Sequence, residues 1–328
     1  MKYGDKMIDI IIPAYNAHET IDRTLFSIAY QDNVDNINVY IVNDYSDHDY
    51  SEFVDFFSNF MNICEIKLEK NSGPGIARQK GIDASKEKYI IFIDSDDNFS
   101  DCFAIKRLYE CIEHGDYDIV TSNFVEELGN QFIDHNNDSV WLHGKIYRRS
   151  FLEDKNISFN STRSNEDNGF NQLIAFMDGK NFYLDSKTYI WRNNLKSLTR
   201  KNDREYNIKG LEGYSYNMLW AMKTAIKNDG NLKAVSELAY LVLVSAYYYY
   251  LKYENLELLH DFLINVREID KILTQYPIEK NRKIELFKMQ QEYSLNNLFG
   301  DEINMIIPTI SFVQFLDILK NVDGECSL

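Results

Sequence analysis

Cysteine is scarce in this chain: there are four among 328 residues, widely spaced and without a Cys-x-x-Cys pair. Such a set supports neither a zinc site nor a disulfide framework, and it is typical of a reducing compartment. Long apolar runs are also missing, because the longest, residues 238–251, falls short of the roughly 18 to 20 residues that a membrane span needs. The sequence shows no secretion signal. We therefore expect a cytoplasmic protein without a transmembrane segment.

Positive charge is in short supply as well. The chain has 35 Lys and Arg residues against 51 Asp and Glu residues, which gives a formal net charge of −16. A surface of this sign repels phosphate backbones and anionic lipid headgroups unless a local basic patch overrides it. Stable nucleic-acid binding is therefore not expected. Packing material is abundant, with 45% hydrophobic and 14% aromatic residues, as in an ordinary globular protein.

The sequence pattern changes near residues 200–206. Before that point, short apolar runs alternate with segments of helical period, which is the pattern of βαβ units on a mostly parallel sheet. After it, the strand signal fades and long helical patterns dominate, as in residues 234–252 and 283–297. A chain of this length fits two domains. We expect an α/β domain over residues 1–204 and a smaller all-α domain over residues 205–328.

Periodicity also places the elements of the first domain. Strands are expected at residues 8–12, 37–42, 64–68, 89–93, 118–125 and 182–191. Helices are expected at residues 21–28, 53–60, 74–84, 104–113 and 170–177. Asn16 and Glu19 resemble a capping box at the start of the first helix. Two polar stretches, residues 129–139 and 156–168, are predicted to be loops.

The apolar run Tyr89–Ile93 ends abruptly in Asp94-Ser95-Asp96-Asp97, which we call the acidic tetrad. Carboxylates this close repel one another in a desolvated cleft and become tolerable when a divalent cation lies between them. The run has the length and β-branched content of a buried strand, so the carboxylates should emerge at its carboxyl end. The alternative is an ordinary solvated turn that caps the next helix.

Polar residues follow the earlier strands too. Asn16, Asp44 and Asp94 each come after a predicted parallel strand, so they should meet at one edge of the sheet, where a nucleotide can lie. Gly73 and Gly75 flank a proline that suits a helix start. As a dinucleotide fingerprint this turn is incomplete, because the third glycine and a matching acidic ribose residue are missing. A Rossmann dehydrogenase is therefore weakly supported.

These motifs, in this order, resemble the family 2 glycosyltransferases of the GT-A fold over about residues 7–200. The segments that carry the resemblance to the donor half are Ile10-Ile-Ile-Pro13-Ala-Tyr15-Asn16, Ile41-Val-Asn-Asp44-Tyr-Ser46-Asp, Asn71-Ser-Gly73-Pro-Gly75-Ile-Ala77-Arg78-Gln-Lys-Gly81 and Ile93-Asp94-Ser95-Asp96-Asp97. Those further along are Gly144-Lys145-Ile-Tyr147-Arg148-Arg-Ser-Phe151, Asn165-Glu166-Asp167-Asn168-Gly-Phe170, and Tyr189-Ile-Trp-Arg192 with Ser197-Leu-Thr199-Arg200. The chain departs from the family at Asn43, where aspartate is frequent, and at Tyr45, where glycine is frequent.

The resemblance implies a GT-A (Rossmann-like) sheet flanked by helices, a nucleotide-sugar donor, most simply a UDP sugar, and Mn²⁺ or Mg²⁺ as cofactor. Asp96 would contact the metal directly, and Asp94 would reach the ribose or a metal-bound water. Asp97 would either join the metal site or only cap the next helix. The donor-binding residues implied by the motifs are Pro13, Tyr15, Asn16, Asp44, Gly73, Arg78, Asp94 and Ser95.

Within that set, Asp44 would accept the nucleobase imide N–H, and Arg78 would pack against the base or lie near the phosphates. Asp167 is the implied catalytic base, with Glu166 as the alternative or as its orienting partner, and attack opposite the diphosphate would invert the anomeric carbon. From composition alone, a Glu-Asp pair in so acidic a chain is usually a solvated turn. Trp141 and His143 are candidates for the acceptor pocket, although a histidine beside a strand is more often structural.

The leading hypothesis is therefore a metal-dependent, inverting hexosyl- or N-acetylhexosaminyltransferase that makes glycans or glycoconjugates. The Gln-x-x-Arg-Trp signature of the processive branch is missing, so one sugar per encounter is expected, on a glycan, lipid-linked or protein acceptor. Two alternatives stay open: a non-catalytic nucleotide-sugar-binding or assembly module, and a sugar transferase that acts on modified nucleic acid bases. The helical domain would bind the acceptor or form a homo-oligomer.

Overall fold

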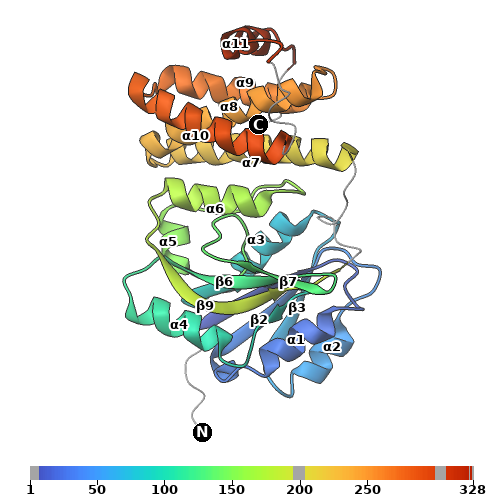
Figure 1. The fold of residues 1–328 in the computed structure, drawn as a ribbon. Helices are drawn as coiled ribbons and strands as arrows, with labels where there is room; N and C mark the ends of the chain where they lie inside the picture. The colour runs from blue at the N-terminus through green and yellow to red at the C-terminus, as the bar shows by residue number, and fades with distance from the viewer. Residues whose placement is uncertain (1–6, 195–203, 300–307, 325, 327–328) are drawn as a thin grey trace. The chain divides into compact units, whose positions relative to one another are not determined.

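The computed structural model describes residues 7–194, 204–299, 308–324 and 326. The chain divides into two compact units, a sheet unit of Met1–Ala175 with Gly179–Lys201 and a helical unit of Phe176–Asp178 with Asn202–Leu328. The first is α/β and the second is all-α (Figure 1). Part of one predicted motif, Ser197 to Arg200, lies outside the described residues.

The first half of the sheet is parallel. Its strands are β1 (Ile8–Ala14), β2 (Ile37–Asn43), β3 (Asn62–Lys67) and β4 (Tyr89–Phe92), in the order β3-β2-β1-β4. All three neighbouring pairs run parallel. The central strands β1 and β4 are rich in isoleucine and buried on both faces, which is how strands of a helix-covered parallel sheet read in sequence. Their carboxyl ends therefore meet at one edge.

The second half of the sheet is mixed. β8 (Lys145–Arg148) runs antiparallel to β4 and to β6 (Ile119–Leu128), and β9 (Asn181–Trp191) runs parallel to β6. The two-residue strand β5 (Asn98–Phe99) pairs with β9. The stretch 129–139 was expected to be a loop, and this expectation is wrong in part, because β7 (Gln131–His135) forms a hairpin with β6. A tight turn at Gly129, which has φ +61°, allows this pairing.

Helices cover both faces of the sheet (Figure 1). One face carries α1 (Ile21–Ala29), α2 (Ser51–Phe57) and α4 (Ala104–His114), and the other carries α3 (Pro74–Ala84), α5 (Arg149–Asp154) and α6 (Glu166–Phe176). The capping box expected at Asn16 and Glu19 is not formed: the residue before α1 is Thr20, and Asn16 instead adopts a turn conformation with φ +49°. Gly81 lets α3 approach β1, since a Cβ there would lie 2.4 Å from Ile11.

The helical unit contains α7 (Arg204–Lys227), α8 (Leu232–Tyr253), α9 (His260–Gln275), α10 (Lys280–Phe299) and α11 (Phe312–Lys320). α8 begins at an Asn231 cap, whose side chain accepts the Ala234 N–H. In the described part of the chain, α8 is the one helix long and apolar enough to cross a membrane, and half of its most apolar window is buried inside the protein. A core helix of a globular unit has the same composition.

Candidate active site

The three polar residues that follow β1, β2 and β4 lie at the carboxyl edge of the parallel half-sheet, as expected. Asn16 joins the first two loops, because its amide exchanges hydrogen bonds with Asp47 and its backbone N–H donates to Ser46 Oγ at 2.9 Å. Asp44 N–H donates to the Ala14 carbonyl at 2.8 Å. Of the neighbouring residues predicted for the donor, Pro13 is partly exposed near the end of β1 and Tyr15 is exposed.

Asp44 organises the glycine turn that precedes α3. Its two carboxylate oxygens accept the N–H groups of Ser72 and Gly73 at 2.7 and 2.8 Å, and the side chain is buried. Gly73 adopts φ +92°, and a Cβ there would approach Arg163 at 3.1 Å, so the residue suits a close turn. The role predicted for Asp44, an acceptor for a nucleobase, is not tested by these contacts.

The acidic tetrad follows β4 and its carboxylates differ in exposure. Asp94 is about one-third exposed, and its Oδ1 accepts from Arg78 Nη2 at 2.7 Å. Asp96 is partly exposed, and its Oδ2 accepts from Asn194 at 2.7 Å. Ser95 contributes its carbonyl, which accepts from Thr20 at 3.1 Å. Two carboxylates of the tetrad therefore reach solvent.

Asp97 is fully buried, and the idea that it caps the next helix is wrong. Its oxygens accept from the Tyr189 hydroxyl at 2.5 Å and from the Arg192 N–H at 2.7 Å, so it ties the tetrad to β9. The following helix α4 begins seven positions later and uses Phe103 as its cap. Periodicity could not show this, because the partners of Asp97 come from about 90 residues further along the chain.

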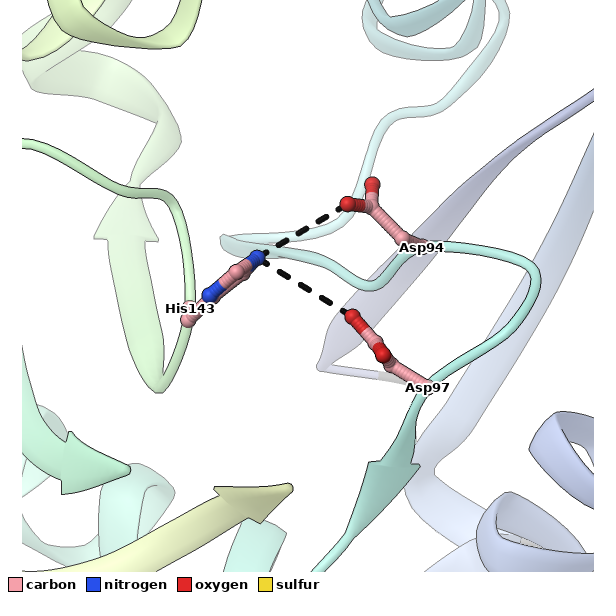
Figure 2. Close-up of side chains that lie close together, drawn as sticks. All are labelled: Asp94, Asp97 and His143. Atoms are coloured by element: carbon pink, nitrogen blue, oxygen red, sulfur yellow. Dashed lines mark ion pairs between the residues drawn. The ribbon is translucent and has the colours of Figure 1, made fainter. Parts of the chain in front are cut away.

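His143 faces both Asp94 and Asp97, and one of its ring nitrogens points toward the two carboxylates (Figure 2). Its Nε2 is 3.7 Å from Asp94 Oδ2 and 3.9 Å from Asp97 Oδ2, and its ring stacks on Tyr189 at 4.6 Å. Within the described residues these three side chains offer possible metal-ligand atoms within 4.8 Å of one another. The buried Nδ1 has no hydrogen-bond partner there. A neutral ring with its proton on Nε2 leaves only a lone pair unsatisfied at Nδ1 and points its N–H toward the two carboxylates, at distances longer than a hydrogen bond.

The electrostatics of the tetrad show an excess of negative charge. Burial raises the pKa of Asp97 well above its usual value, and the charges of Asp96 and Asp94 add to this effect. Burial and the charge of Asp94 also raise the pKa of Asp96. Burial opposes ionisation of Asp94 as well, but the Arg78 guanidinium and the His143 contact hold its pKa below the usual range. Burial lowers the pKa of His143.

Arg78 connects the tetrad to the acidic pair predicted to hold the catalytic base. The residue is buried in α3, and its Nη1 donates to Glu166 Oε1 at 2.6 Å while Nη2 donates to Asp94. Its guanidinium lies 5.9 Å from the Phe159 ring, which packs beside it. Charge-assisted hydrogen bonds from one rigid fork fix the two carboxylates relative to each other. The sequence motif pointed to Arg78, but not to this bridge.

Glu166 and Asp167 form the first turn of α6. Glu166 is buried against Gly75, where a Cβ would lie 3.1 Å from Glu166 Cγ, so the glycine makes room for the acidic pair. Asp167 is half-buried and accepts the Asn168 N–H at 2.7 Å. Burial and the charge of Glu166 raise the pKa of Asp167 to about 7, despite the opposing charge of Arg78. This value suits a group that takes up a proton near neutral pH.

Two residues near this site carry roles that the sequence did not assign. Lys145 in β8 is buried and donates to the Trp141 carbonyl, and burial lowers the pKa of its ammonium to about 8. Asn171 in α6 donates to the same carbonyl at 3.1 Å and accepts from the Tyr147 hydroxyl at 3.0 Å. No strand was predicted at Lys145, and its place directly before Ile146 and Tyr147 in the motif 144–151 is the signal that could have drawn attention to it.

Comparison with known proteins supports the resemblance over part of the chain. Residues 9–164, just under half of the chain, match the family described as "Glycosyl transferase family 2". The predicted recognition and the predicted enzyme class, glycosyltransferase, are therefore confirmed. The matched residues contain the acidic tetrad, Arg78 and the glycine turn, whereas Asp167 lies just beyond them.

Similar relatives share part of the chain. The putative glycosyltransferase EpsH of Bacillus subtilis is 24% identical over 64% of this chain and 67% of its own. The processive diacylglycerol beta-glycosyltransferase of Mycoplasma pneumoniae is 28% identical over 57% of this chain and 50% of its own. The poly(ribitol-phosphate) beta-N-acetylglucosaminyltransferase TarS of Staphylococcus aureus is 26% identical over 56% of this chain and 35% of its own.

A solved structure extends the likeness to the fold. TarS residues 1–349, crystallised with UDP-GlcNAc, superimpose with a TM-score of 0.63 at 19% identity, over 89% of this chain and 93% of that one. The GT-A fold class predicted from the sequence, with its helical C-terminal part, is confirmed. At this identity the likeness establishes the fold and leaves the ligand open.

Proposed function

We propose that this chain is a metal-dependent, inverting family 2 glycosyltransferase that moves one sugar from a UDP sugar to an acceptor hydroxyl. The observation that carries the proposal is the Arg78 bridge, which holds Asp94 of the acidic tetrad and Glu166 of the acidic pair at 2.7 and 2.6 Å. One guanidinium thus ties the carboxylates suited to a cation to the first turn of α6, which also carries Asp167, the carboxylate suited to a proton. Glycosyl transfer needs charge stabilisation at the leaving diphosphate and a proton acceptor at the attacking hydroxyl, on opposite sides of the anomeric carbon.

The residues fit a divalent cation. Asp94 and Asp96 are partly exposed oxygen donors with surplus negative charge around them, and Mg²⁺ and Mn²⁺ prefer such ligands. Asp97 is less suited, because it is fully buried and both of its oxygens already accept hydrogen bonds. We therefore assign the cation to Asp96 and Asp94, with His143 supporting Asp94. When bound, such a cation neutralises negative charge that develops on the leaving diphosphate.

Asp167 is proposed to be the catalytic base. As the acceptor oxygen forms its bond to the anomeric carbon, its proton passes to the Asp167 carboxylate and the bond from carbon to the diphosphate oxygen breaks. Attack from the side opposite the diphosphate inverts the anomeric configuration. Glu166 cannot easily take this role, since it is buried and engaged by Arg78, so it positions Arg78 and the first turn of α6.

The donor is proposed to be a UDP hexose or UDP N-acetylhexosamine. The support is the co-crystallisation of TarS with UDP-GlcNAc and the similar fold of this chain. The donor would lie along the carboxyl edge of β1, β2 and β4, where Pro13, Tyr15, Asn16, Asp44, Gly73 and Ser95 gather. Asp44, which already holds the glycine turn, would accept a hydrogen bond from the nucleobase. Arg78 would lie beneath the sugar diphosphate.

A donor-hydrolysis screen tests the proposal. Purified protein is incubated with UDP, GDP and CDP sugars in Mg²⁺, Mn²⁺ or EDTA, and release of nucleotide is measured. We expect release from a UDP sugar that requires the cation and is lost in Asp96→Asn. Asp55→Asn, an exposed carboxylate on α2, is the matched control and should keep full activity. Release in EDTA equal to that in Mn²⁺ would contradict metal dependence.

The same assay separates two further points. No release with any donor would favour the alternative of a non-catalytic nucleotide-sugar-binding module. With an acceptor present, one sugar added per product supports single transfer, whereas a ladder of longer products would contradict it. This matters because the Mycoplasma pneumoniae relative is named as processive. The stereochemistry of the new bond, read by NMR, tests inversion.

The acceptor is proposed to be a glycan or glycoconjugate in the cytoplasm. No stable nucleic-acid partner is proposed, because the chain carries a net charge of −16. The helical unit is proposed to contribute acceptor binding or a homo-oligomer contact. Light scattering of the purified chain distinguishes these roles, since a monomer at assay concentration leaves acceptor binding as the role.

A further inference from the structure

The sheet unit contains a pair of tryptophans beside the proposed site. The chain has three tryptophans, and Trp141 and Trp191 pack together with ring centroids 5.1 Å apart and an angle of 46° between the rings. Both indoles are half-buried, so each presents part of its surface outward. The third, Trp220, lies in α7 of the helical unit.

The pair is continuous with the acidic tetrad. The His143 ring stacks on Trp141 at 5.7 Å and lies 5.3 Å from Trp191, while its Nε2 faces Asp94 and Asp97. Trp191 ends β9, one residue before the Arg192 N–H that donates to Asp97. The aromatic surface therefore begins where the proposed cation site ends.

The pair is also tied to the helix that carries the proposed base. The Trp141 carbonyl accepts from Asn171 of α6, and Asn171 lies four residues after Asp167. Residues four apart in an α-helix share a face, so Asp167 lies on the side of α6 that looks toward the Trp141 turn. Asp138 caps that turn by accepting the Trp141 N–H at 2.9 Å.

The described charged side chains around the pair are either carboxylates or cations that already have a partner. Asp94 and Asp97 face the His143 ring that stacks on Trp141, and Asp138 accepts the Trp141 N–H. The described cations nearby are engaged: Arg78 by two carboxylates and Lys145 by the Trp141 carbonyl. Arg192 contacts Glu127 at 3.6 Å and the Asn98 amide at 2.8 Å. A polyanionic acceptor would meet repulsion here, whereas a neutral one would not.

We propose that Trp141 and Trp191 form a platform on which a neutral sugar ring of the acceptor stacks. A pyranose presents a face of C–H groups that packs on an aromatic ring, while an acyclic polyol phosphate has no such face and carries charge. The inference rests on the proposed function. It names the acceptor class as a neutral, ring-containing glycan, unlike the poly(ribitol-phosphate) in the name of TarS.

Intrinsic fluorescence tests the proposal directly. In Trp220→Phe the emission comes from Trp141 and Trp191 alone, because the chain has three tryptophans. With UDP and Mn²⁺ present, we titrate methyl glycosides of glucose, galactose and N-acetylglucosamine, their β-linked disaccharides, and ribitol 5-phosphate. We expect a saturable shift in emission with at least one ring sugar and none with ribitol 5-phosphate. The proposal would be overturned if ribitol 5-phosphate were the one probe that gives a saturable shift. It would also be overturned if none of the probes gave one.

Kinetics separate this inference from the proposed function. Trp141→Leu and Trp191→Leu should raise the KM for the sugar that shifts the fluorescence by about tenfold or more. They should leave hydrolysis of the donor in the absence of acceptor within twofold of the parent. If donor hydrolysis is absent in the parent, the proposed function fails. If hydrolysis is present and both variants keep the parent KM, the platform alone fails.

A conservative exchange distinguishes stacking from a merely structural role. Trp141→Tyr keeps an aromatic face and should restore at least half of the acceptor affinity lost in Trp141→Ala. Phe182→Ala, which removes an exposed aromatic from the far end of β9, is the control and should leave acceptor KM unchanged. Equal acceptor KM values for Trp141→Tyr and Trp141→Ala would contradict stacking.

Discussion

The two halves of the sheet bring different chemistry to the same site. The parallel half, β3-β2-β1-β4, ends in loops of carboxylates, amides and glycines that are held by hydrogen bonds between neighbouring strand ends. The mixed half, β8-β6-β9-β5, contributes rings and a buried lysine, and its members pack on one another through His143. Under the proposed function, the first half would hold the charged donor, and the second presents an apolar surface.

This difference follows from strand direction. Parallel strands deliver all of their carboxyl ends to one edge, so a short motif after each strand is enough to assemble a polar site. In the mixed half, residues reach the site from the start of β8, from the end of β9 and from a turn, and they interact through ring packing. Breaking one half should therefore affect donor chemistry, and breaking the other should affect the acceptor.

The largest effect is expected from Asp167→Asn. The amide cannot accept the acceptor proton as a carboxylate does, so turnover with acceptor should fall by about a thousandfold. Binding of the donor, measured by titration calorimetry with the UDP sugar and Mn²⁺, should stay within a few-fold of the parent. Glu166→Gln is the comparison and should retain more turnover than Asp167→Asn. Equal turnover in Asp167→Asn and the parent would remove Asp167 from the mechanism.

The next largest effect is expected from Arg78, the link between the two carboxylate groups. Arg78→Ala leaves Asp94 and Glu166 unpaired in a buried site and should lower the free energy of unfolding by about 3–5 kcal/mol. Arg78→Lys keeps a charge but loses the fork, and misplacing the groups should cost about a hundredfold in turnover.

A surface bridge of the same chemistry provides the control for Arg78. Arg107 makes two hydrogen bonds to exposed Asp101, at 2.9 and 2.8 Å. Arg107→Lys should change stability by less than about 1 kcal/mol, because water screens exposed pairs. Denaturant unfolding measures both variants. If Arg78→Lys changes stability and turnover as little as Arg107→Lys does, the Arg78 bridge does not contribute to function.

A change of pH should have a smaller effect than these substitutions. Below the pKa of Asp167, kcat/KM should change about tenfold per pH unit. The pKa of Asp167 is raised to about 7, and the base works only when ionised, so kcat/KM should rise with pH up to about 7 and then level off. Stability should change in the opposite sense. The folded protein holds this proton more tightly than the unfolded chain, so the free energy of unfolding falls as pH rises from about 4 to about 7. In Asp167→Asn this contribution to the decrease in the free energy of unfolding between about pH 4 and pH 7 should be absent. Thermal unfolding across the same pH range measures it.

The smallest effect is expected at the first strand end. Asn16 has φ +49°, so Asn16→Ala should cost about 1 kcal/mol, whereas Asn16→Gly tolerates the conformation and loses only the side-chain pair with Asp47. Both variants should raise the donor KM a few-fold and leave the acceptor KM unchanged. An acceptor KM that rises more than the donor KM would break the division between the halves.

Much of the parallel half could be predicted from the sequence alone. The isoleucine-rich runs around Ile10 and Ile91 are buried on both faces, and the polar residues after them lie where a parallel sheet must place them. The family resemblance supplied the candidate roles of Asp96, Asp167 and Arg78, which stay predictions until they are measured. The helix start near Asn16 was wrong, because its side chain bonds across to Asp47 and does not cap α1.

The mixed half could not be predicted in the same way. The Asp97 contacts with Tyr189 and Arg192 join positions more than 90 residues apart, and no local period encodes such a pair. Strand β7 was missed because it has no buried apolar face: Phe132 and Ile133 are adjacent, point to opposite faces and are both exposed. The Arg78 bridge was missed for the same reason as the Asp97 contacts, because Arg78 and Glu166 are 88 positions apart in the chain.

The tryptophan pair gives the site an optical signature of its own. Two indoles 5.1 Å apart and tilted by 46° are close enough for their electronic excitations to couple, and we expect a paired positive and negative band in the ultraviolet circular dichroism spectrum. That couplet depends on the geometry of one turn and one strand end. The integrity of the acceptor side can therefore be followed in solution before any acceptor is known.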